Sequence, residues 1–152
     1  MTDPLIIIVG AGPGLGAAVA RRFGAAGYAV ALIGRTPDRL RRLAEDLQSA
    51  GVHANWSAVD VTHAAALAAA VEQLAQAAGR VDVLHFNPSV YRPRTALELT
   101  AEELLEDVRL GVAALLTAVQ AARPFMREGA RVVVTGSAAA DRPSPAAASL
   151  GV

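Results

Sequence analysis

A glycine-rich stretch directly after the first apolar run is the part of the chain best suited to chemistry. Residues 9–16 read Val-Gly-Ala-Gly-Pro-Gly-Leu-Gly and lie between a β-branched run and a helical pattern. Backbone N–H groups at such a turn, together with the positive end of the helix dipole, can hold a pyrophosphate. Glycine is needed because a Cβ would block the close approach of the phosphates. The candidate ligand-binding residues of this turn are Gly10, Gly12, Pro13, Gly14, Leu15 and Gly16.

The spacing of the glycines distinguishes two kinds of nucleotide-binding turn. The common pattern G-x-G-x-x-G fails when it begins at Gly10, because position 15 is Leu15. Instead, Gly10, Gly14 and Gly16 satisfy G-x-x-x-G-x-G. This spacing, between a strand pattern and a helix pattern, resembles that of the short-chain dehydrogenase/reductase family. The alternative is a tight glycine turn that binds no ligand.

Two further sites match cofactor-binding positions of that family. Arg35, followed by Thr36, comes after the second apolar run, where the resemblance implies a basic residue that pairs with the 2′-phosphate of NADP(H). Members that prefer NAD(H) usually carry an acid where this chain has Gly34. Asp60 and Val61 resemble the Asp-Val pair that contacts the adenine. We therefore expect NADP(H) to be favoured over NAD(H); the alternatives are a solvated arginine and a helix-preceding aspartate.

The resemblance weakens in the second half of the chain. The family's Asn-Asn-Ala-Gly segment aligns with residues 86–89, Phe-Asn-Pro-Ser, and leaves only Asn87 as a cofactor-binding candidate. Residues 132–137 match the strand that ends in the family's catalytic serine, which orients the substrate carbonyl. Ser137 is therefore the candidate catalytic residue, unless its hydroxyl only completes a turn.

Other catalytic positions of the family lack their usual residues. The asparagine of the proton relay aligns with Gly111, and the catalytic tyrosine aligns with Leu150. The lysine would follow at position 154, but the chain ends at Val152 and all 14 basic residues are arginines. The resemblance thus implies an NADP(H)-dependent oxidoreductase for a carbonyl or alcohol substrate that is not competent as this chain alone. The alternative is a non-catalytic dinucleotide-binding or interaction module. A methyltransferase or flavin domain is disfavoured, because it would carry an acid after the second strand.

The elements that must position these residues alternate between strands and helices. Apolar runs predict strands at 5–9, 28–33, 52–59, 81–86 and 131–135, and helical patterns cover 14–26, 37–50, 62–78 and 100–122. Thr62 is expected to cap the third helix. A capping box formed by Thr100 and Glu103 is expected to open the fourth. We expect one α/β domain over residues 1–152, a Rossmann-like doubly wound parallel sheet of order 3-2-1-4-5 with helices on both faces, truncated after the fifth strand.

Composition limits the possible partners. The 14 basic residues balance 14 acidic ones, which argues against nucleic acid. There is no cysteine, and no apolar run long enough to cross a membrane, so we expect a cytoplasmic protein without membrane contact. The three histidines lack metal-ligand spacing, and we expect no metal site. Arg92 and Arg94 in the loop after the fourth strand either contact an anionic substrate or are solvated.

The carboxy-terminal part of the predicted sheet suggests self-association. Three consecutive valines, at 132–134, would lie on the outer edge of the fifth strand with unpaired backbone groups. The long helix adds apolar residues, and the resemblance implies dimerisation through that helix. We therefore expect a homo-oligomer or poor solubility.

Overall fold

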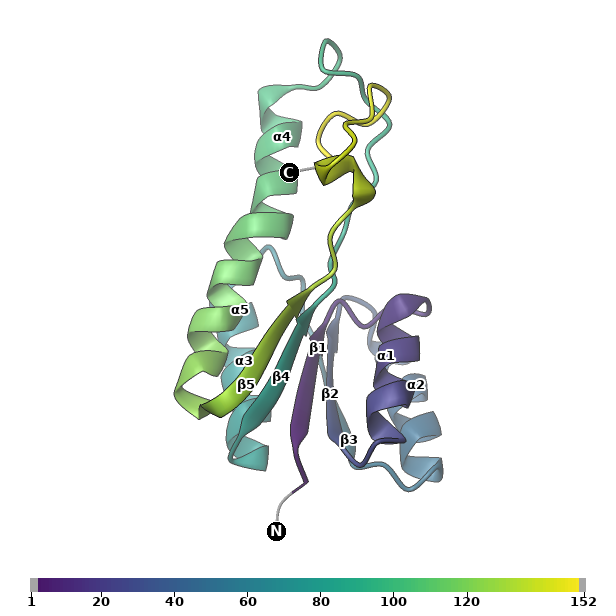
Figure 1. Cartoon of the computed structure of the whole chain (residues 1–152), viewed down its shortest axis with the longest axis vertical. Helices are drawn as coiled ribbons and strands as arrows, with labels where there is room; N and C mark the ends of the chain where they lie inside the picture. The colour runs from purple at the N-terminus through teal and green to yellow at the C-terminus, as the bar shows by residue number, and fades with distance from the viewer. Residues whose placement is uncertain (1–2, 151–152) are drawn as a thin grey trace.

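The computed structural model describes residues 3–150, which form one parallel five-stranded sheet with helices on both faces (Figure 1). The strand order is β3-β2-β1-β4-β5, so the predicted doubly wound fold is confirmed. The strands are β1 Leu5–Val9, β2 Ala29–Gly34, β3 Ala54–Ala58, β4 Val81–Phe86 and β5 Met126–Val134. The helices are α1 Leu15–Gly24, α2 Pro37–Ser49, α3 Ala64–Ala78, α4 Ala101–Val108 and α5 Ala114–Ala122, with shorter turns η1 Arg109–Ala113, η2 Arg123–Phe125 and η3 Ala138–Ala140.

Strand β1 lies at the centre of the sheet and is buried on both faces. Ile6 and Ile8 pack against α1 and α2, whereas Leu5, Ile7 and Val9 pack against α3 and α5. A strand covered on both sides needs apolar residues at every position, which explains the uninterrupted run in the sequence. The centre of the sheet is therefore a rigid base for the segments that follow the strands.

Helix α2 covers the face of the sheet beside β2 and β3. Its stripe of Leu40, Leu43, Ala44 and Leu47 is buried, as the spacing i, i+3, i+4, i+7 predicts. Pro37 begins the helix, where its missing N–H and fixed φ cost nothing. This helix carries several arginines on its other faces, and its first turn lies beside the glycine-rich segment.

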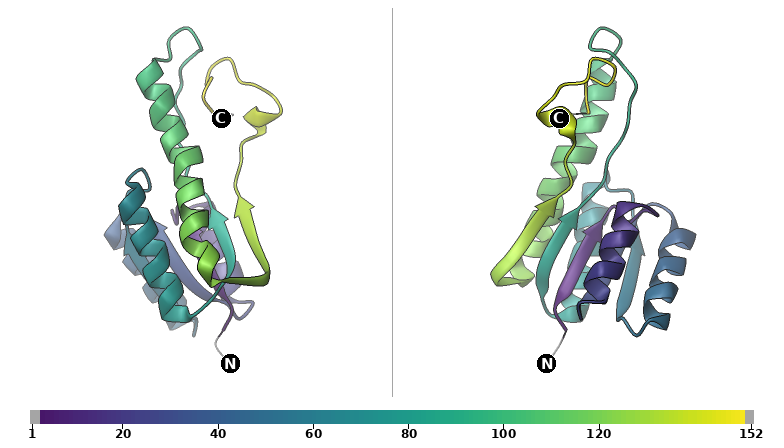
Figure 2. Two further views of the ribbon diagram at one scale, coloured as in Figure 1. Left: turned by 90° about the vertical axis from the view of Figure 1, so that its left-hand side faces the viewer. Right: turned by 45° about the vertical axis from the view of Figure 1, so that its right-hand side comes forward.

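The long helix predicted over residues 100–122 is interrupted. The expected capping box is present: the Thr100 hydroxyl accepts from the backbone N–H of Glu103, and the Glu103 carboxylate accepts from the N–H of Thr100, both at 3.1 Å. The π-helical turn η1, which contains Gly111, then separates α4 from α5. Helix α4 consequently extends beyond the carboxyl edge of the sheet (Figure 2). No helix within residues 3–150 combines the length and apolar character needed to cross a bilayer.

Strand β5 is longer than expected and has an irregular register. It begins at Met126, which pairs with Val81, and the register shifts between Val81 and Val83. Gly129 adopts a φ of 86° within this part of the strand. The hydrophobic pattern missed residues 126–130 because they are mostly polar or small. The other strand and helix boundaries lie within two residues of those expected, except that the long helix is divided.

Candidate functional site

The candidate site is a cavity of about 310 Å³ at the carboxyl ends of β1, β2 and β4. The strand order reverses between β1 and β4, which is where open α/β sheets bind their ligands. Seven of the residues singled out in the sequence line this cavity: Gly10, Gly12, Pro13, Arg35, Thr36, Val61 and Asn87. Gly14, Leu15, Gly16, Asp60 and Ser137 do not line it.

The glycines of the turn at residues 10–16 have two different roles. A Cβ on Gly10 would lie 2.7 Å from the backbone nitrogen of Pro88, and a Cβ on Gly16 would lie 2.8 Å from the carbonyl oxygen of Gly10. Gly10 also has a φ of 87°, which side chains rarely adopt. By contrast, a Cβ on Gly12 or on Gly14 would meet no atom of the described residues within 4 Å. Close packing of the backbone therefore requires glycine at positions 10 and 16, whereas open space lies beside Gly12 and Gly14.

The start of α1 offers backbone donors beside this open space. The helix begins at Leu15, and Gly14 has no side chain with which to cap it. The first N–H groups of a helix have no partner within the helix; that of Ala17 donates to the carbonyl oxygen of Gly12 at 3.0 Å, so the donors for a ligand are those of Leu15 and Gly16. An anion at this position would receive these hydrogen bonds and would also interact favourably with the helix dipole. The glycine turn can therefore hold a phosphate group.

The end of β2 places cationic and hydroxyl groups on the opposite wall. Arg35 and Thr36 line the cavity, and the Thr36 side chain makes no capping hydrogen bond to α2. Arg39, in the first turn of α2, lines the same cavity. Sequence reasoning missed Arg39, although its distance of four residues from Arg35 was visible. The wall is therefore suited to a negatively charged group.

At the end of β3, the structure brings Val61 rather than Asp60 to the cavity wall. Thr62 donates its backbone N–H and its hydroxyl to one carboxylate oxygen of Asp60, at 3.0 and 2.7 Å. These two bonds hold the pKa of Asp60 below its usual value, with smaller contributions from His63 and Arg35. Thr62 is thus not the cap of α3, because its side chain bonds Asp60; the helix begins after His63.

Asn87 connects the end of β4 to the glycine turn. Its side-chain Nδ2 donates to the carbonyl oxygen of Gly10 at 3.1 Å, and its backbone N–H donates to the carbonyl oxygen of Val9 at 2.8 Å. Pro88 and Ser89 follow it along the cavity wall. The side chain of Asn87 therefore stabilises the site by holding two of its segments together.

Ser137 follows β5, and its hydroxyl accepts a hydrogen bond from the backbone N–H of Ala139 at 3.1 Å. The hydroxyl therefore closes the turn η3, yet it can still donate its own proton.

Two residues before Ser137, the Thr135 hydroxyl contacts Nε2 of His85 at 2.9 Å. His85 is buried in the sheet, which lowers its pKa, and its Nδ1 has no hydrogen-bond partner among the described residues.

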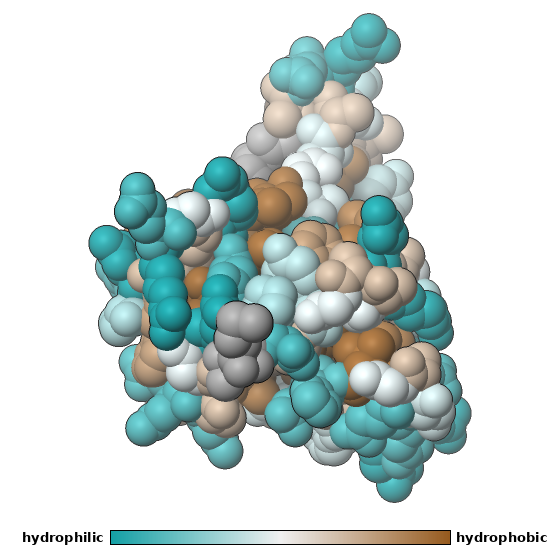
Figure 3. Space-filling view, turned by 60° about the horizontal axis from the view of Figure 1, so that its bottom comes forward, coloured by the Kyte–Doolittle hydropathy of each residue, from teal (hydrophilic) through white to brown (hydrophobic). Residues whose placement is uncertain are grey.

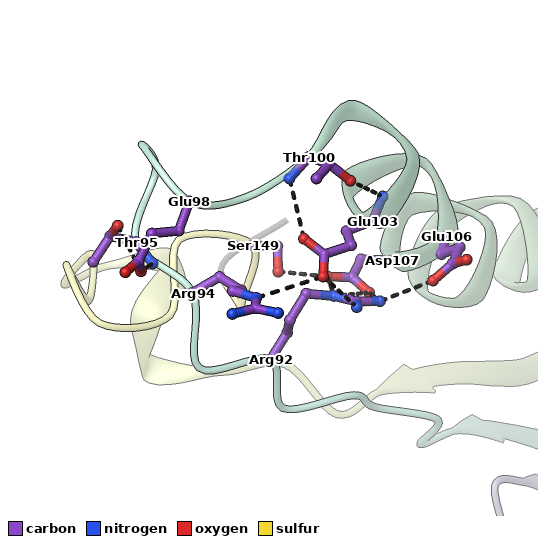
Figure 4. Close-up of polar contacts among 9 residues, drawn as sticks. All are labelled: Arg92, Arg94, Thr95, Glu98, Thr100, Glu103, Glu106, Asp107 and Ser149. Carbon is purple, nitrogen blue, oxygen red and sulfur yellow. Dashed lines mark hydrogen bonds and ion pairs between the residues drawn. The ribbon is translucent and has the colours of Figure 1, made fainter.

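Arg92 and Arg94 both pair with acidic residues of α4 (Figure 4); the Arg92 side chain is 21% exposed, whereas that of Arg94 is 52% exposed and largely solvated. The Arg92 guanidinium donates to Asp107 and Glu106 at 3.0 Å and to Glu103 at 3.3 Å. The Arg92 hydrogen bonds are the main cause that holds the pKa of Asp107 below its usual value. The acids at positions 103, 106 and 107 share one helix face, a spacing that could have indicated these pairs in the sequence.

The cluster formed by Arg92 and the acidic residues of α4 also binds the segment that follows Ser137. The buried Ser149 hydroxyl donates to Asp107 at 2.5 Å, and the backbone N–H of Ala148 donates to the carbonyl oxygen of Arg94 at 2.9 Å. Residues 138–150 therefore lie against α4 and the loop after β4, as two views of the ribbon show (Figure 2). Leu150 is part of this segment and is partly buried.

A second cavity, of about 390 Å³, lies at the opposite end of the sheet. Figure 3 shows this end of the molecule, where apolar side chains emerge between polar ones. The lining of this second cavity is mostly alanine and leucine. It also includes His53 and Asp3, which are paired at 3.0 Å. It contains none of the residues singled out in the sequence as cofactor-binding or catalytic candidates.

Comparisons with known proteins agree with this geometry. A family model described as short chain dehydrogenase matches residues 4–150. An uncharacterized oxidoreductase of Mycobacterium tuberculosis is 32% identical over 128 residues, which cover 84% of this chain and 49% of that protein. A short-chain dehydrogenase/reductase from Serratia marcescens superposes with a TM-score of 0.92 at 30% identity, covering 97% of this chain and 61% of that one. A short chain dehydrogenase from Burkholderia cenocepacia in complex with NADP gives a TM-score of 0.90 at 30% identity, covering 97% and 60%. The chain spans about half the length of the curated relatives it matches.

Proposed function

The chain belongs to the short-chain dehydrogenase family, and on that premise we propose that it binds NADP(H) for an oxidoreductase that acts on a carbonyl or alcohol substrate. One observation carries the proposal: the cavity combines the glycine turn with two arginines, and no acidic residue is among the described residues that line it. A 2′-phosphate needs cationic partners, whereas a free ribose hydroxyl is usually bound by a carboxylate. The NADP complex of the Burkholderia relative supports this choice of cofactor.

Each wall of the cavity has a role in this proposal. The N–H groups of the glycine turn receive the pyrophosphate, and Arg35 with Thr36 receives the 2′-phosphate. Val61 follows β3 and contacts the adenine. Asp60 lies next to it and is held by its own turn. Asn87 keeps the glycine turn in place against β4. The cofactor supplies a hydride acceptor or donor.

The catalytic step is only partly provided by this chain. Ser137 is the residue that we propose to orient the substrate carbonyl, and its hydroxyl retains a proton for that purpose. Leu150 cannot donate a proton to a developing alkoxide, and the sequence contains no lysine to lower the pKa of such a donor. We therefore propose that these 152 residues bind the cofactor without completing hydride transfer alone.

A second candidate function is a non-catalytic dinucleotide-binding or interaction module. It is favoured by Gly111 and Leu150, which stand where the family carries a relay asparagine and the catalytic tyrosine. A dinucleotide-binding module also predicts cofactor binding and an interaction module does not, but only the oxidoreductase predicts turnover in a longer polypeptide that supplies a tyrosine and a lysine. Oxidation of NADPH by such a longer polypeptide with a panel of aldehydes would separate them.

The test of cofactor binding is a titration of this chain with NADPH and with NADH, followed by nicotinamide fluorescence. We expect NADPH to bind more tightly, and Arg35→Ala to weaken NADPH binding by about 1.5–3 kcal/mol, as for a hydrogen bond to a charged group. NADH binding should be unchanged by the same substitution. Arg22→Ala is the matched control, because Arg22 is an exposed arginine of α1 that does not line the cavity. Absence of binding by both nucleotides would overturn the proposal.

A further inference from the structure

Arg39 occupies a position between two cavities that meet at the glycine turn. It lines the 310 Å³ cavity together with Arg35 and Thr36. It also lines a smaller cavity of about 200 Å³ on the α1 side of the turn, whose other charged lining residues are Arg21, Arg42 and Asp46. Both cavities include Gly12 and Pro13 of the turn, and Arg39 is the only charged residue in both linings among the described residues. A group bound at the turn would therefore meet Arg39 on its α2 side.

The charges around Arg39 leave its guanidinium available to a ligand. Asp38 pairs with Arg41 at 3.1 Å, and Asp46 pairs with Arg21 at 3.6 Å. The nearby aspartates of α2 are thus engaged by other arginines. Within residues 3–150 no ion pair involves Arg39. An arginine that no carboxylate neutralises, at the wall of a cavity without acidic lining, favours an anionic ligand.

The glycine turn itself contributes no cationic side chain. Its inner positions are Gly12, Pro13 and Gly14; Pro13 has no N–H and the Gly12 N–H donates to the carbonyl oxygen of Gly10 at 2.9 Å, so the turn neutralises little of a ligand's charge. A phosphate monoester carries a charge between about −1.5 and −2 at neutral pH, more than one guanidinium neutralises. A second cation must come from another segment, and Arg39 is the one that shares the cavity with Arg35.

We propose that Arg39 is a second specificity residue for the 2′-phosphate, which it binds together with Arg35. This inference rests on the proposed function, because it assigns a further residue to the same cofactor site. Two guanidiniums, separated by four residues at the end of β2 and the start of α2, present several N–H donors to one phosphate. The preference for NADP(H) is then divided between two residues, so removal of Arg35 alone leaves part of it.

The test uses calorimetric titration of the 152-residue chain with adenosine 2′,5′-bisphosphate and with 5′-AMP, which differs only in lacking the 2′-phosphate. Neither probe needs the nicotinamide half of the site. We expect Arg39→Ala to weaken binding of the bisphosphate by about tenfold or more and to change AMP binding by less than about twofold. Arg39→Lys keeps the charge but loses the planar set of donors, so it should restore only part of the affinity. The double variant with Arg35→Ala should abolish the difference between the two probes.

Arg42→Ala is the matched control, because Arg42 lies on the same helix but lines only the smaller cavity. An equal loss in Arg39→Ala and Arg42→Ala would overturn the proposal, since it would reflect the general positive field of α2. Unchanged affinity in Arg39→Ala, with Arg35→Ala still weakened, would overturn it while leaving the proposed function intact. Failure of the unaltered chain to bind the bisphosphate more tightly than 5′-AMP would overturn both. Far-ultraviolet circular dichroism establishes that each variant is folded.

Discussion

The side-chain amide of Asn87 and the carbonyl oxygen of Gly10 form a hydrogen bond of 3.1 Å between residues that are 77 positions apart in the chain. Next to it, the space at the α-carbon of Gly10 is closed by the backbone of Pro88. The end of β4 and the start of the glycine turn are thus in direct contact where the strand order reverses. The two walls of the cavity must keep a fixed spacing, and a ligand at the turn meets a preformed site.

Replacement of Asn87 tests this contact. Asn87→Ala removes the side-chain donor of the Gly10 carbonyl group, which keeps its bond from the Gly12 N–H at 2.9 Å, and we expect the free energy of unfolding to fall by about 0.5–1.5 kcal/mol. Urea denaturation measures the change. Asn55→Ala, on an exposed position of β3, is the control and should have little effect. Equal stability of the two variants would show that the hydrogen bond does not stabilise the fold.

The glycine turn predicts a separation between stability and binding. Gly16→Ala places a Cβ 2.8 Å from the Gly10 carbonyl oxygen, so we expect it to destabilise the fold by about 1–3 kcal/mol. Gly12→Ala meets no atom within 4 Å in the described chain and should leave stability nearly unchanged. The same methyl group projects toward the ligand space and should weaken NADPH binding by about tenfold, or 1.4 kcal/mol. Full NADPH affinity in Gly12→Ala would contradict this division of roles.

The Asp107 carboxylate is predicted to control the order of residues 138–150. Asp107→Asn removes the charge that Arg92 and Ser149 bind, so the amide hydrogen of Ala148 should exchange faster with solvent. Amides of the glycine turn should exchange at an unchanged rate. Glu102→Gln removes an exposed carboxylate from the same helix, outside the Arg92 contacts given above, and serves as control. Exchange at Ala148 that is the same in both variants would refute the role of Asp107.

Acid should weaken the contacts of Asp107 with Arg92 and Ser149, and the direction of this pH dependence follows from the pKa of Asp107. Because that pKa is lower in the folded chain than its ordinary value of 3.8, the unfolded chain binds the proton more readily. The contribution to stability is complete above about pH 3.8 and is lost as the pH falls through the folded pKa. Hydrogen exchange at Ala148 as a function of pH, after correction for the intrinsic exchange rate, measures this loss.

His85 predicts a second pH dependence, at higher pH. Burial lowers the pKa of His85 below its ordinary value of 6.5, so below that pH the unfolded chain binds a proton that the folded chain does not. The free energy of unfolding should therefore be highest above pH 6.5 and decrease as the pH falls from 6.5 toward the folded pKa. His85→Gln should reduce this slope, whereas His63→Gln, at an exposed position, should retain it. Parallel slopes in all three proteins would exclude His85 as the source.

The exposed edge of β5 should promote self-association. The side chains of Val132, Val133 and Val134 are 43%, 47% and 49% exposed, and β5 is the last strand of the described sheet. We expect concentration-dependent association in sedimentation velocity, reduced by Val133→Lys. Val112→Lys tests the exposed side of the long helix as the other surface. A monomer at every concentration would contradict both.

The strand order and most boundaries were predictable because buried parallel strands leave a strong pattern. The continuous apolar run at residues 5–9 predicts a buried parallel strand. Glycines 51 and 79 mark the ends of α2 and α3. The start of β5 was not predictable, because Met126 pairs with Val81 and the register then shifts to Arg131 and Val83, so the residues between lie in an irregular, largely exposed part of the strand. Hydrophobic periodicity does not detect a strand of that kind.

The candidate site was predictable where a backbone turn defines it, and not where side chains from distant segments meet. The glycine spacing located the turn, and Arg35 followed from its place after β2. Arg92 was seen as a possible substrate contact because its acidic partners lie on α4, more than ten residues away. The spacing of the acids indicates an acidic face of the helix, but the loop residue that this face meets depends on the direction of the helix.

The π turn η1 also determines how the two halves of the long helix are oriented. In an uninterrupted α-helix, Asp107 would lie almost in line with Ala114, because seven residues complete nearly two turns. The additional residue of the π turn offsets α4 from α5 by about 100° of rotation. Deletion of one residue from η1 would leave six residues from Asp107 to Ala114, about 600° of regular α-helix, and would keep Asp107 directed toward Arg92. The π turn at residues 109–113 therefore sets the rotation of α4 relative to α5. With α5 packed on the sheet, this rotation determines where α4 holds the loop after β4 and residues 138–150.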